Sequence, residues 1–411
     1  MKILHLGKFY PPHHGGIETS MCNLAEAGVK IGHSVQCIVS CPGALKSYWD
    51  NINGVQVHRL ATFGKLLSMP ITPAFLVEPL GNSDLIHVHI PNPLAELKIL
   101  FSSRNKKILP FVHALPLTQG KLGELWFSMI TEKILNLSEK VLISNSYQIE
   151  AFPQLKKWKN KIRVVPFVAE CISGTTYENL LSKRALSTTV VAVGRLVKYK
   201  GFDILLKAWA KFLKKKSENI KYSLKIVGDG PEKNNLLEII KNENINGTVQ
   251  MLGAVDDFSK NKILEEAILF VAPSINSSET FGISILEAMS KGLPVITTRL
   301  PTGVAALARG GECGAVVRPL SVEDLSFALQ ELLDAPRSRN EIGRQNLLYA
   351  KANHSPEVMM TAYEHILNSS ENEKSSNIIQ FPSRIEKKVV SDLNSNEQVA
   401  VKEVLRKVGS K

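Results

Sequence analysis

The chain has 411 residues, which is too long for one ordinary hydrophobic core and favours two domains. Its net charge is +12, and residues 1–170 hold +7 of it, with a cluster at Lys156, Lys157, Lys159, Lys161 and Arg163. Such a charge can bind an anionic lipid or a phosphorylated substrate, or it can simply keep one face of the protein hydrated. No nucleic-acid module is visible, and no apolar run reaches the roughly 18 residues of a membrane span.

Five cysteines, an odd number without metal-type spacing, predict reduced thiols in a cytosolic protein. The first residues are too polar for a signal sequence and predict a strand at 2–7. Further strands are expected at 34–40, 54–60, 85–90, 108–112, 140–144 and 161–166. Helical spacing of apolar residues is expected at 18–29 and 124–137.

Residues 167–187 interrupt this alternation and are the expected linker. A second set of strands is expected at 189–194, 223–228, 248–252, 268–272, 294–298 and 315–318. Strands that alternate with helices at this interval indicate parallel sheets, and therefore two Rossmann-like α/β domains facing a cleft. Residues 369–377 are expected to be disordered, and 397–408 predict either a short helix or a loose tail.

The most informative segment contains two carboxylates, Glu279 and Glu287, eight positions apart. The buried strand at 268–272 precedes them, so Glu279 is expected in a loop at the carboxyl end of a strand, where α/β sheets bind ligands. Glu287 follows on the next helix. The free N–H groups near Gly282 and Ile283, where that helix starts, favour an anion.

This segment resembles the E-x7-E motif of retaining GT-B glycosyltransferases, in particular family four, and the resemblance extends from Lys2 to about Leu367. It implies an acceptor-binding domain at 1–170, a nucleotide-sugar domain at 171–352, a crossover helix at 353–368 and a flexible tail at 369–411. It also implies that Glu279 and the backbone of Phe281, Gly282 and Ile283 hold the donor sugar, whereas Glu287 holds the ribose.

Two loops match the cationic and glycine-rich parts of that family. Arg195 and Lys200 match the pair that neutralises the leaving diphosphate, although two surface cations beside a turn would look the same. Gly15 and Gly16 match a phosphate-binding helix start, where no Cβ blocks the approach of backbone N–H groups. Gly228 matches a turn near the nucleotide, which turn geometry alone also explains.

Histidines mark the expected acceptor side. The resemblance implies that His113 lies beside the reacting carbon, where it would donate a hydrogen bond or carry charge, and the alternative is a buried, satisfied histidine. His89 and Asn92 are candidate acceptor contacts. His13 and His14 lack partners at ligand spacing, so no metal site is expected.

The sequence therefore predicts a metal-independent enzyme that moves a sugar from a nucleoside diphosphate donor to a glycan or lipid-linked glycan, with retention of configuration. The donor is a GDP- or UDP-sugar, with GDP-mannose as one candidate, and no cofactor is expected. The enzyme would work in the cytoplasm or at the inner face of the membrane. A glycogen-synthase-like polymerase and a non-catalytic nucleotide-sugar-binding subunit are the alternatives.

Overall fold

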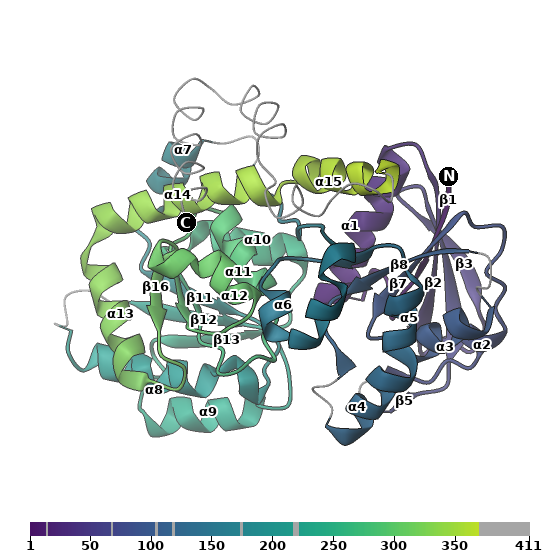
Figure 1. Cartoon of the computed structure of the whole chain (residues 1–411). Helices are drawn as coiled ribbons and strands as arrows, with labels where there is room; N and C mark the ends of the chain where they lie inside the picture. Colours follow the sequence, from purple (N-terminus) through teal and green to yellow (C-terminus); the bar gives the residue numbers. More distant parts are fainter. Residues whose placement is uncertain are drawn as a thin grey trace. The chain divides into compact units, whose positions relative to one another are not determined.

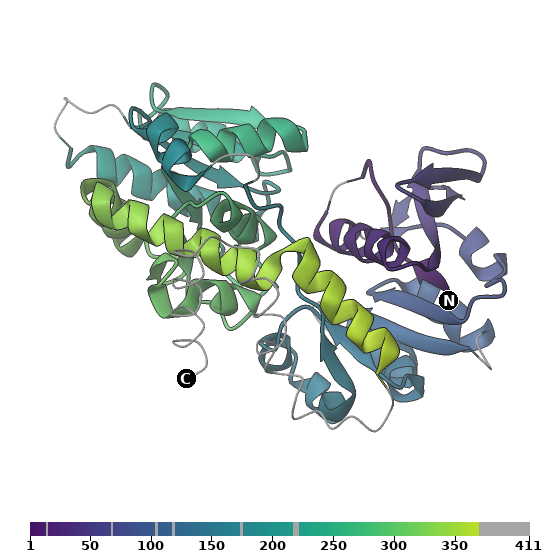
Figure 2. The same ribbon diagram turned by 90° about the horizontal axis from the view of Figure 1, so that it is seen from above.

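The computed structural model describes residues 1–13, 15–66, 69–102, 106–116, 120–172, 176–216 and 222–369. The chain forms two compact units (Figures 1 and 2). The first contains residues 1–168 and the described residues from Pro356 onward, and the second contains residues 169–355. The helix expected at 397–408 lies outside the described residues.

The first unit is built on an eight-stranded sheet in the order β10-β9-β8-β7-β1-β2-β4-β3, in which the strand order reverses between β1 and β7. Its strands are β1 (Lys2–Leu6), β2 (Ser34–Pro42), β3 (Tyr48–Ile52), β4 (Val55–Thr62), β7 (Leu85–Ile90), β8 (Lys107–Val112), β9 (Val141–Ile143) and β10 (Ile162–Val164). A separate two-stranded hairpin joins β5 (Lys65–Leu66) to β6 (Met69–Pro70).

Helices cover both faces of this sheet. Successive strand residues point to opposite faces, and apolar residues on each face pack against the helices on that side. Ile3 and Leu85 face α1 and α15, whereas Leu4 and Ile86 face the α3 and α5 side. The helical segments are α1 (Gly16–Lys30), α2 (Ala74–Val77), α3 (Pro93–Ser102), α4 (Lys121–Trp126), the π-helix η2 (Phe127–Thr131), α5 (Glu132–Leu137), α6 (Gln148–Ala151), the 3-10 helix η3 (Pro153–Lys161) and α15 (Pro356–Asn368).

One strand of this sheet departs from the parallel pattern that the sequence predicted. β3 pairs antiparallel with β4, and the two are joined through Asn53 and Gly54, both with positive φ. Asn-Gly is the usual sequence of a tight hairpin turn. The strand itself was missed because β3 is an edge strand with mostly exposed side chains and has no apolar run.

The second unit contains a six-stranded parallel sheet in the order β13-β12-β11-β14-β15-β16. This is the Rossmann order 3-2-1-4-5-6. Its strands are β11 (Thr189–Val193), β12 (Ser223–Val227), β13 (Val249–Gly253), β14 (Leu269–Ala272), β15 (Val295–Thr298) and β16 (Gly314–Val317). The expected fold class is therefore confirmed in both units.

Helices flank this second sheet as well (Figure 1). One face packs on α8 (Phe202–Leu213), α9 (Lys233–Asn242) and α13 (Val322–Asp334), whose apolar residues share one core with the strands. The remaining helical segments are α7 (Tyr177–Arg184), η4 (Lys198–Lys200), α10 (Asp257–Glu266), α11 (Ile283–Ser290), α12 (Gly303–Ala308), η5 (Arg309–Gly311) and α14 (Pro336–His354). The expected closing helix at 353–368 begins later, at Pro356, because α14 continues to His354.

The expected linker at 167–187 is wrong in its second half. Residues 177–184 form α7, which the hydroxyl of Thr176 caps by accepting the Asn179 N–H. Arg184 is buried and donates to the carbonyls of Glu265 and Lys291, among others, so α7 is anchored to the second unit. The segment looked like a linker because α7 is short and mostly polar, and only Tyr177, Leu180 and Arg184 are buried along it.

Candidate functional site

The strand order of the second unit brings two of the predicted loops together. β11 and β14 are neighbours at the point where the strand order reverses, and in open α/β sheets ligands bind beside this point at the carboxyl ends of the strands. The loop after β11 contains Arg195 and Lys200. The loop after β14 contains Glu279, so residues far apart in sequence meet at one edge.

Glycines allow these loops to approach closely. Gly201 has φ +67°, and a Cβ on it would lie 2.2 Å from the carbonyl oxygen of Pro273. Gly228 has φ +138°, and a Cβ there would lie 2.0 Å from the carbonyl oxygen of Gly194. No larger residue fits either position. Gly228, predicted as a nucleotide contact, therefore has a packing role that explains its presence.

An ion pair between Lys200 and Glu279 lies at this edge. Lys200 Nζ lies 2.5 Å from Glu279 Oε2, and the Ser274 hydroxyl donates to the same oxygen at 3.0 Å. The side chains of Lys200 and Glu279 are 15% and 12% exposed. Gly201 sets this pair, because its approach to Pro273 brings the end of η4 against the loop that follows β14.

Arg195 does not join this ion pair. Its side chain is exposed and forms no hydrogen bond or ion pair with any described residue. Its neighbour Leu196 is fully buried and is held by backbone hydrogen bonds with Asp229 and Glu232. The loop is thus anchored while the Arg195 guanidinium remains available to an anion.

Helix α11 begins at the same edge with an open N-terminus. Gly282, with φ +86°, is its N-cap residue and no side chain caps the helix. The amide groups of Gly282 and Ile283 have no acceptor among the described residues. Phe281 is 4% exposed and packs edge-on against His354, so its ring belongs to the core. The first turn therefore carries an uncompensated partial positive charge directly after the loop that contains Glu279.

Glu287 forms a second, separate ion pair. Its Oε1 lies 2.8 Å from Lys260 Nζ, and Lys260 also contacts Asp257 at 2.7 Å. Burial opposes the charge on Lys260, but the two carboxylates raise its pKa. Sequence reasoning did not find Lys260, since α10 is an ordinary charged helix with no motif, and it did not find Ser274 either. Ser274 is the second residue after β14, and a polar residue so close to the carboxyl end of a strand is a signal that could have been used.

In the first unit, the predicted glycine loop leads into α1 beside the switch point between β1 and β7. α1 begins at Gly16, and no side chain caps it. A Cβ on Gly15 would lie 2.2 Å from Glu18 Oε2, so the missing side chain makes room for that carboxylate. Burial raises the pKa of Glu18, although its own backbone N–H and Lys8 oppose the shift. His14 lies outside the described residues.

His113 follows β8 directly and is 5% exposed. Burial lowers its pKa to about 3, so it is neutral at physiological pH. Of the two roles expected for it, hydrogen-bond donation is compatible with this environment, whereas carrying charge near neutral pH is not. Its ring stacks on Phe111 with centroids 4.3 Å apart.

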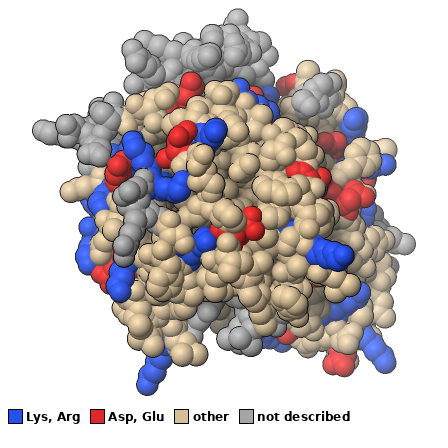
Figure 3. Space-filling model, turned by 90° about the vertical axis from the view of Figure 1, so that its right-hand side faces the viewer, with Lys and Arg blue, Asp and Glu red and all other residues tan. Residues whose placement is uncertain are grey.

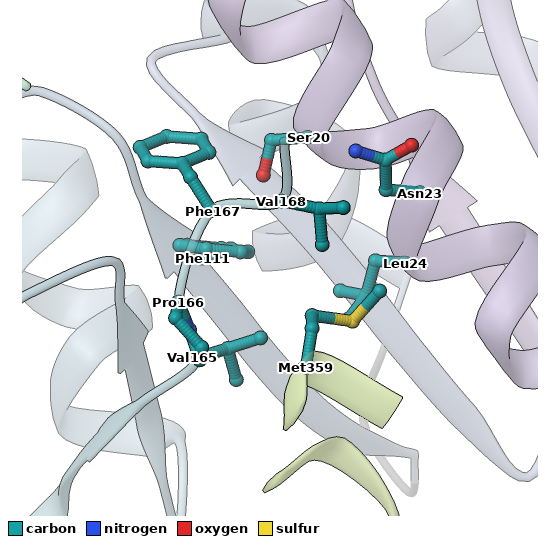
Figure 4. Close-up of a pocket in the computed structure, with 9 residues that line it drawn as sticks. All are labelled: Ser20, Asn23, Leu24, Phe111, Val165, Pro166, Phe167, Val168 and Met359. Carbon is teal, nitrogen blue, oxygen red and sulfur yellow. The ribbon is translucent and has the colours of Figure 1, made fainter. Parts of the chain in front are cut away.

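A small pocket borders this histidine (Figure 4). Phe111 and Phe167, which line the pocket, both stack on the His113 ring. The other residues that line it are Ser20, Asn23 and Leu24 of α1, Val165, Pro166, Val168 and Met359, so Ser20 and Asn23 are its polar side chains.

The two candidate acceptor contacts are buried. His89 is 1% exposed, and both of its ring nitrogens are within hydrogen-bond distance of other histidines. Asn92 is 5% exposed and accepts the Ala95 N–H at the start of α3. Both residues therefore build the interior of the unit.

The basic cluster near residue 160 is smaller than the sequence suggested. Lys161 donates to the carbonyls of Asn136 and Ser138, and Arg163 is buried and donates to Asn160 and Ile162. Lys157 pairs with Glu132, which leaves Lys156 and Lys159 as exposed cations. On the face shown in Figure 3, cations and carboxylates are interspersed among uncharged residues.

Three further sequence expectations concern metals, membranes and thiols. Among the described residues, no three His, Cys, Asp or Glu side chains converge as metal ligands. Within the same residues, no helix is both long and apolar enough to cross a bilayer. The five cysteines are all described, and none forms a disulfide.

Comparison with known protein families gives one match in each unit. Residues 175–347 match the group 1 glycosyl transferases, and residues 14–167 match Glycosyltransferase Family 4. The first match covers the Lys200 and Glu279 loops and both ion pairs. Both matches are to glycosyltransferases, and the chain is a glycosyltransferase.

Three similar glycosyltransferases come from bacteria. The chain is 26% identical to the D-rhamnosyltransferase WbpZ of Pseudomonas aeruginosa over 84% of this chain and 90% of the relative. It is 23% identical to the O-antigen chain mannosyltransferase C of Escherichia coli over 89% and 98%. It is 25% identical to a GDP-mannose:cellobiosyl-diphosphopolyprenol alpha-mannosyltransferase of Komagataeibacter xylinus over 83% and 88%.

Solved structures share the fold of this glycosyltransferase. A sucrose-phosphate synthase from Thermosynechococcus elongatus matches with a TM-score of 0.70 and 20% identity over 89% of this chain and 98% of that one. HepE of Anabaena, solved in complex with UDP and glucose, matches with a TM-score of 0.68 and 18% identity over 90% and 100%. At this identity the likeness concerns the GT-B fold alone.

Proposed function

We propose that this glycosyltransferase moves a sugar from a nucleoside diphosphate to a hydroxyl group of a glycan or lipid-linked glycan, retaining the anomeric configuration and using no metal. The observation that supports this most is the meeting of Lys200, Glu279 and the open start of α11 at the strand-order switch. Cations and amides favour a diphosphate, and the carboxylate beside them can accept hydrogen bonds from sugar hydroxyls.

The ligand rearranges the ion pair in this proposal. Lys200 Nζ turns from Glu279 Oε2 toward the diphosphate, and Ser274 continues to hold the same carboxylate oxygen. The exposed Arg195 closes on the diphosphate from its anchored loop. Together these cations stabilise the negative charge that develops as the sugar leaves.

The proton of the acceptor hydroxyl passes to the leaving diphosphate in this reaction. His113 does not act as the base, because burial lowers its pKa to about 3 and leaves it a weak base at neutral pH. The new bond forms on the face from which the diphosphate departs, through an oxocarbenium-like state, so configuration is retained without a covalent nucleophile. Arg195, Lys200 and the α11 amides take the place that a metal ion fills in other sugar transferases.

GDP-mannose is the first donor to test, and a lipid-linked glycan is the first acceptor. Two similar proteins are named as mannosyltransferases, and one of those names specifies GDP-mannose and a diphosphopolyprenol acceptor. UDP-sugars stay in the test because HepE was solved with UDP and glucose. The base must be recognised by residues other than the ion pairs, because the diphosphate and the ribose that Lys200 and Glu287 would hold are common to all these donors.

We place the enzyme in the cytoplasm, docked at the inner face of the membrane. The helical stretch α4–η2 exposes three apolar side chains, spaced so that they share one face of a helix. They are Leu122, Leu125 and Met129, which are 75%, 56% and 53% exposed. Lys156 and Lys159 lie on η3, whose Lys157 pairs with Glu132 at the start of α5. Exposed apolar residues next to cations are typical of a surface that binds anionic lipids.

Slow donor hydrolysis tests the proposed function without knowledge of the acceptor. The full chain is incubated with GDP-mannose, other GDP-sugars and UDP-sugars in EDTA, and release of the nucleoside diphosphate is followed. We expect release from one class of donor, with calorimetric affinity for its nucleoside diphosphate. Binding without release from any donor would favour a non-catalytic nucleotide-sugar-binding subunit. Extension of a glucan primer would favour the polymerase alternative.

A further inference from the structure

A cavity of the second unit lies at the amino ends of its strands. It is bordered by Ile268, which precedes β14, and by Gly292 and Pro294, which precede β15. Helix α7 and the start of α14, which lie side by side, complete its wall (Figure 1). Lys200 and Glu279 follow the carboxyl ends of strands in the same sheet, so the cavity is remote from their ion pair. Its volume is about 120 Å³, which is room for several water molecules or for a phosphate group.

Arg184 brings a buried positive charge to this cavity. The residue is 6% exposed and donates only to backbone carbonyls, among them those of Glu265 and Lys291. The Glu265 carboxylate pairs instead with Lys291, at 3.8 Å, and Arg184 forms no ion pair with any described residue. Burial lowers the pKa of Arg184 to about 10, so the guanidinium is still charged at pH 7. Buried charges are normally paired with an opposite charge, and this one is not.

Helix α14 adds hydrogen-bond donors to the same cavity. Arg339 donates from Nη1 to two carbonyls at the end of α13, whereas its Nη2 has no partner among the described residues and reaches solvent. The side-chain amide of Asn340 also forms no hydrogen bond with a described residue. Pro336, which lines the cavity, begins this 19-residue helix, and no side chain caps it. The partial positive charge of the helix start therefore lies at the cavity.

The charges around the cavity are mostly positive. None of the described residues that line it is acidic. Burial raises the pKa of the Tyr177 hydroxyl in its wall to about 12, three nearby arginines oppose this shift, and one carboxylate, that of Glu341, adds to it. The three arginines are Arg184, Arg339 and Arg344. The cavity therefore favours an anion, and guanidinium groups pair best with planar carboxylates and with phosphates.

We propose that this cavity binds the phosphate group of a small molecule, either inorganic phosphate or a sugar phosphate, at a site separate from that of the donor. Arg339 Nη2 and the Asn340 amide donate to the phosphate oxygens, while Arg184 and the start of α14 stabilise the negative charge. The bound anion joins α7, α14 and the segment before β15. Binding therefore stabilises the folded second unit.

Calorimetry and thermal melts of the full chain in phosphate-free buffer test this proposal. The probes are inorganic phosphate and mannose 1-phosphate. We expect saturable binding, with a melting temperature that rises with the concentration of the probe. Tighter binding of mannose 1-phosphate identifies a sugar phosphate as the ligand, and tighter or equal binding of inorganic phosphate identifies the free anion. No saturable binding of either probe at millimolar concentrations would overturn the proposal.

Two variants locate the bound anion. Arg339→Gln removes a donor and a charge, and Asn340→Asp places a carboxylate in the cavity without a change in size or the loss of a side-chain hydrogen bond to a described residue. Each should lower the affinity for phosphate at least about tenfold. Arg337→Gln is the matched control, because Arg337 is exposed on the same helix and does not line the cavity. Its affinity for phosphate should equal that of the wild-type protein.

Lys200→Ala separates this cavity from the donor site. It should bind phosphate as the wild-type protein does, and the two cavity variants should keep wild-type affinity for the nucleoside diphosphate. The proposal is therefore tested even if the proposed donor site fails. Loss of phosphate binding in Lys200→Ala with normal binding in Asn340→Asp would place the anion at the donor site and overturn the proposal. Arg339→Gln can also destabilise the end of α13, so Asn340→Asp decides if Arg339→Gln does not fold.

Discussion

At the residue scale, the cations of the second unit make distinct predictions. Lys200→Ala removes the positive charge that, in the proposed function, stabilises the leaving diphosphate. It should therefore lower turnover on the order of 10²–10³-fold. It also leaves Glu279, with a side chain 12% exposed, without its ion-pair partner, so a loss of thermal stability should accompany it. Arg195→Ala should lower turnover without a change in stability, because Arg195 is exposed and has no partner among the described residues.

Lys207→Ala is the control for these variants, since Lys207 is an exposed cation on α8. Steady-state kinetics and melting curves of the three variants separate a role in turnover from a role in stability. Normal turnover in Arg195→Ala and Lys200→Ala would leave both residues as surface and structural cations.

The buried histidines predict an acid-sensitive first unit. Burial lowers the pKa of His87 and His113 to about 3 and places those of His5 and His89 well below the usual value. Below pH 6.5 the unfolded chain therefore binds more protons than the folded chain. The stabilisation is complete above that pH and is lost as the pH falls toward 3, by about 2 kcal/mol each for His87 and His113 at pH 5.

Denaturant unfolding at pH 7.5 and at pH 5 measures this loss. In the wild-type protein, the free energy of unfolding should fall steeply between the two. His87→Leu should show a smaller fall, because it has one fewer buried histidine, and the exposed His365→Gln should behave as wild type. Equal free energies at the two pH values would mean that these rings accept protons in the folded state.

At the element scale, the approach of η4 to the loop after β14 should depend on Gly201. Gly201→Ala places a Cβ 2.2 Å from a backbone oxygen at φ +67°, so the loops must separate. Gly253 has φ +70° but nothing within 4 Å, and Gly253→Ala therefore measures the cost of the backbone conformation alone, about 1–2 kcal/mol. We expect Gly201→Ala to lower the melting temperature further and to weaken nucleoside diphosphate binding. Equal effects of the two variants would contradict the role of this contact.

The helical stretch α4–η2 predicts membrane association. Leu122→Ser combined with Leu125→Ser should reduce co-sedimentation with vesicles that contain anionic lipid, and Lys156→Ser combined with Lys159→Ser should reduce it mainly at low salt. Nucleoside diphosphate affinity should be unchanged in both, which serves as the folding control. Equal sedimentation of wild type and variants, or none with any vesicle, would remove this surface from the proposal.

At the scale of the whole molecule, the sequence predicted what apolar runs determine. The strand expected at 85–90 is β7 residue for residue, and all expected strands are present within two residues. The edge strand β3 and the helix α7 were missed, because β3 is mostly exposed and α7 is a short helix with only two buried apolar side chains, Tyr177 and Leu180.

Contacts between residues on different strands could not be predicted from the sequence, for a different reason. Lys200 and Glu279 were each predicted as site residues, but their pairing depends on the neighbourhood of β11 and β14, which spacing along the chain does not give. The same holds for His89, whose ring nitrogens meet those of His5 and His113 only through the order of three strands. Lys260 shows the third limit, since a lysine on a charged helix has no feature that marks it as the partner of Glu287.

The central claim is that this glycosyltransferase transfers its sugar with retention of configuration, using Lys200 and Glu279 at the strand-order switch. The most direct measurement is the anomeric configuration of the sugar first released from the active α-configured nucleotide sugar, followed by NMR in EDTA before mutarotation. We predict an α-anomer from the wild-type enzyme and no turnover from the Lys200→Ala, Glu279→Ala double variant. A β-anomer as the first product, or unchanged turnover in the double variant, would contradict it.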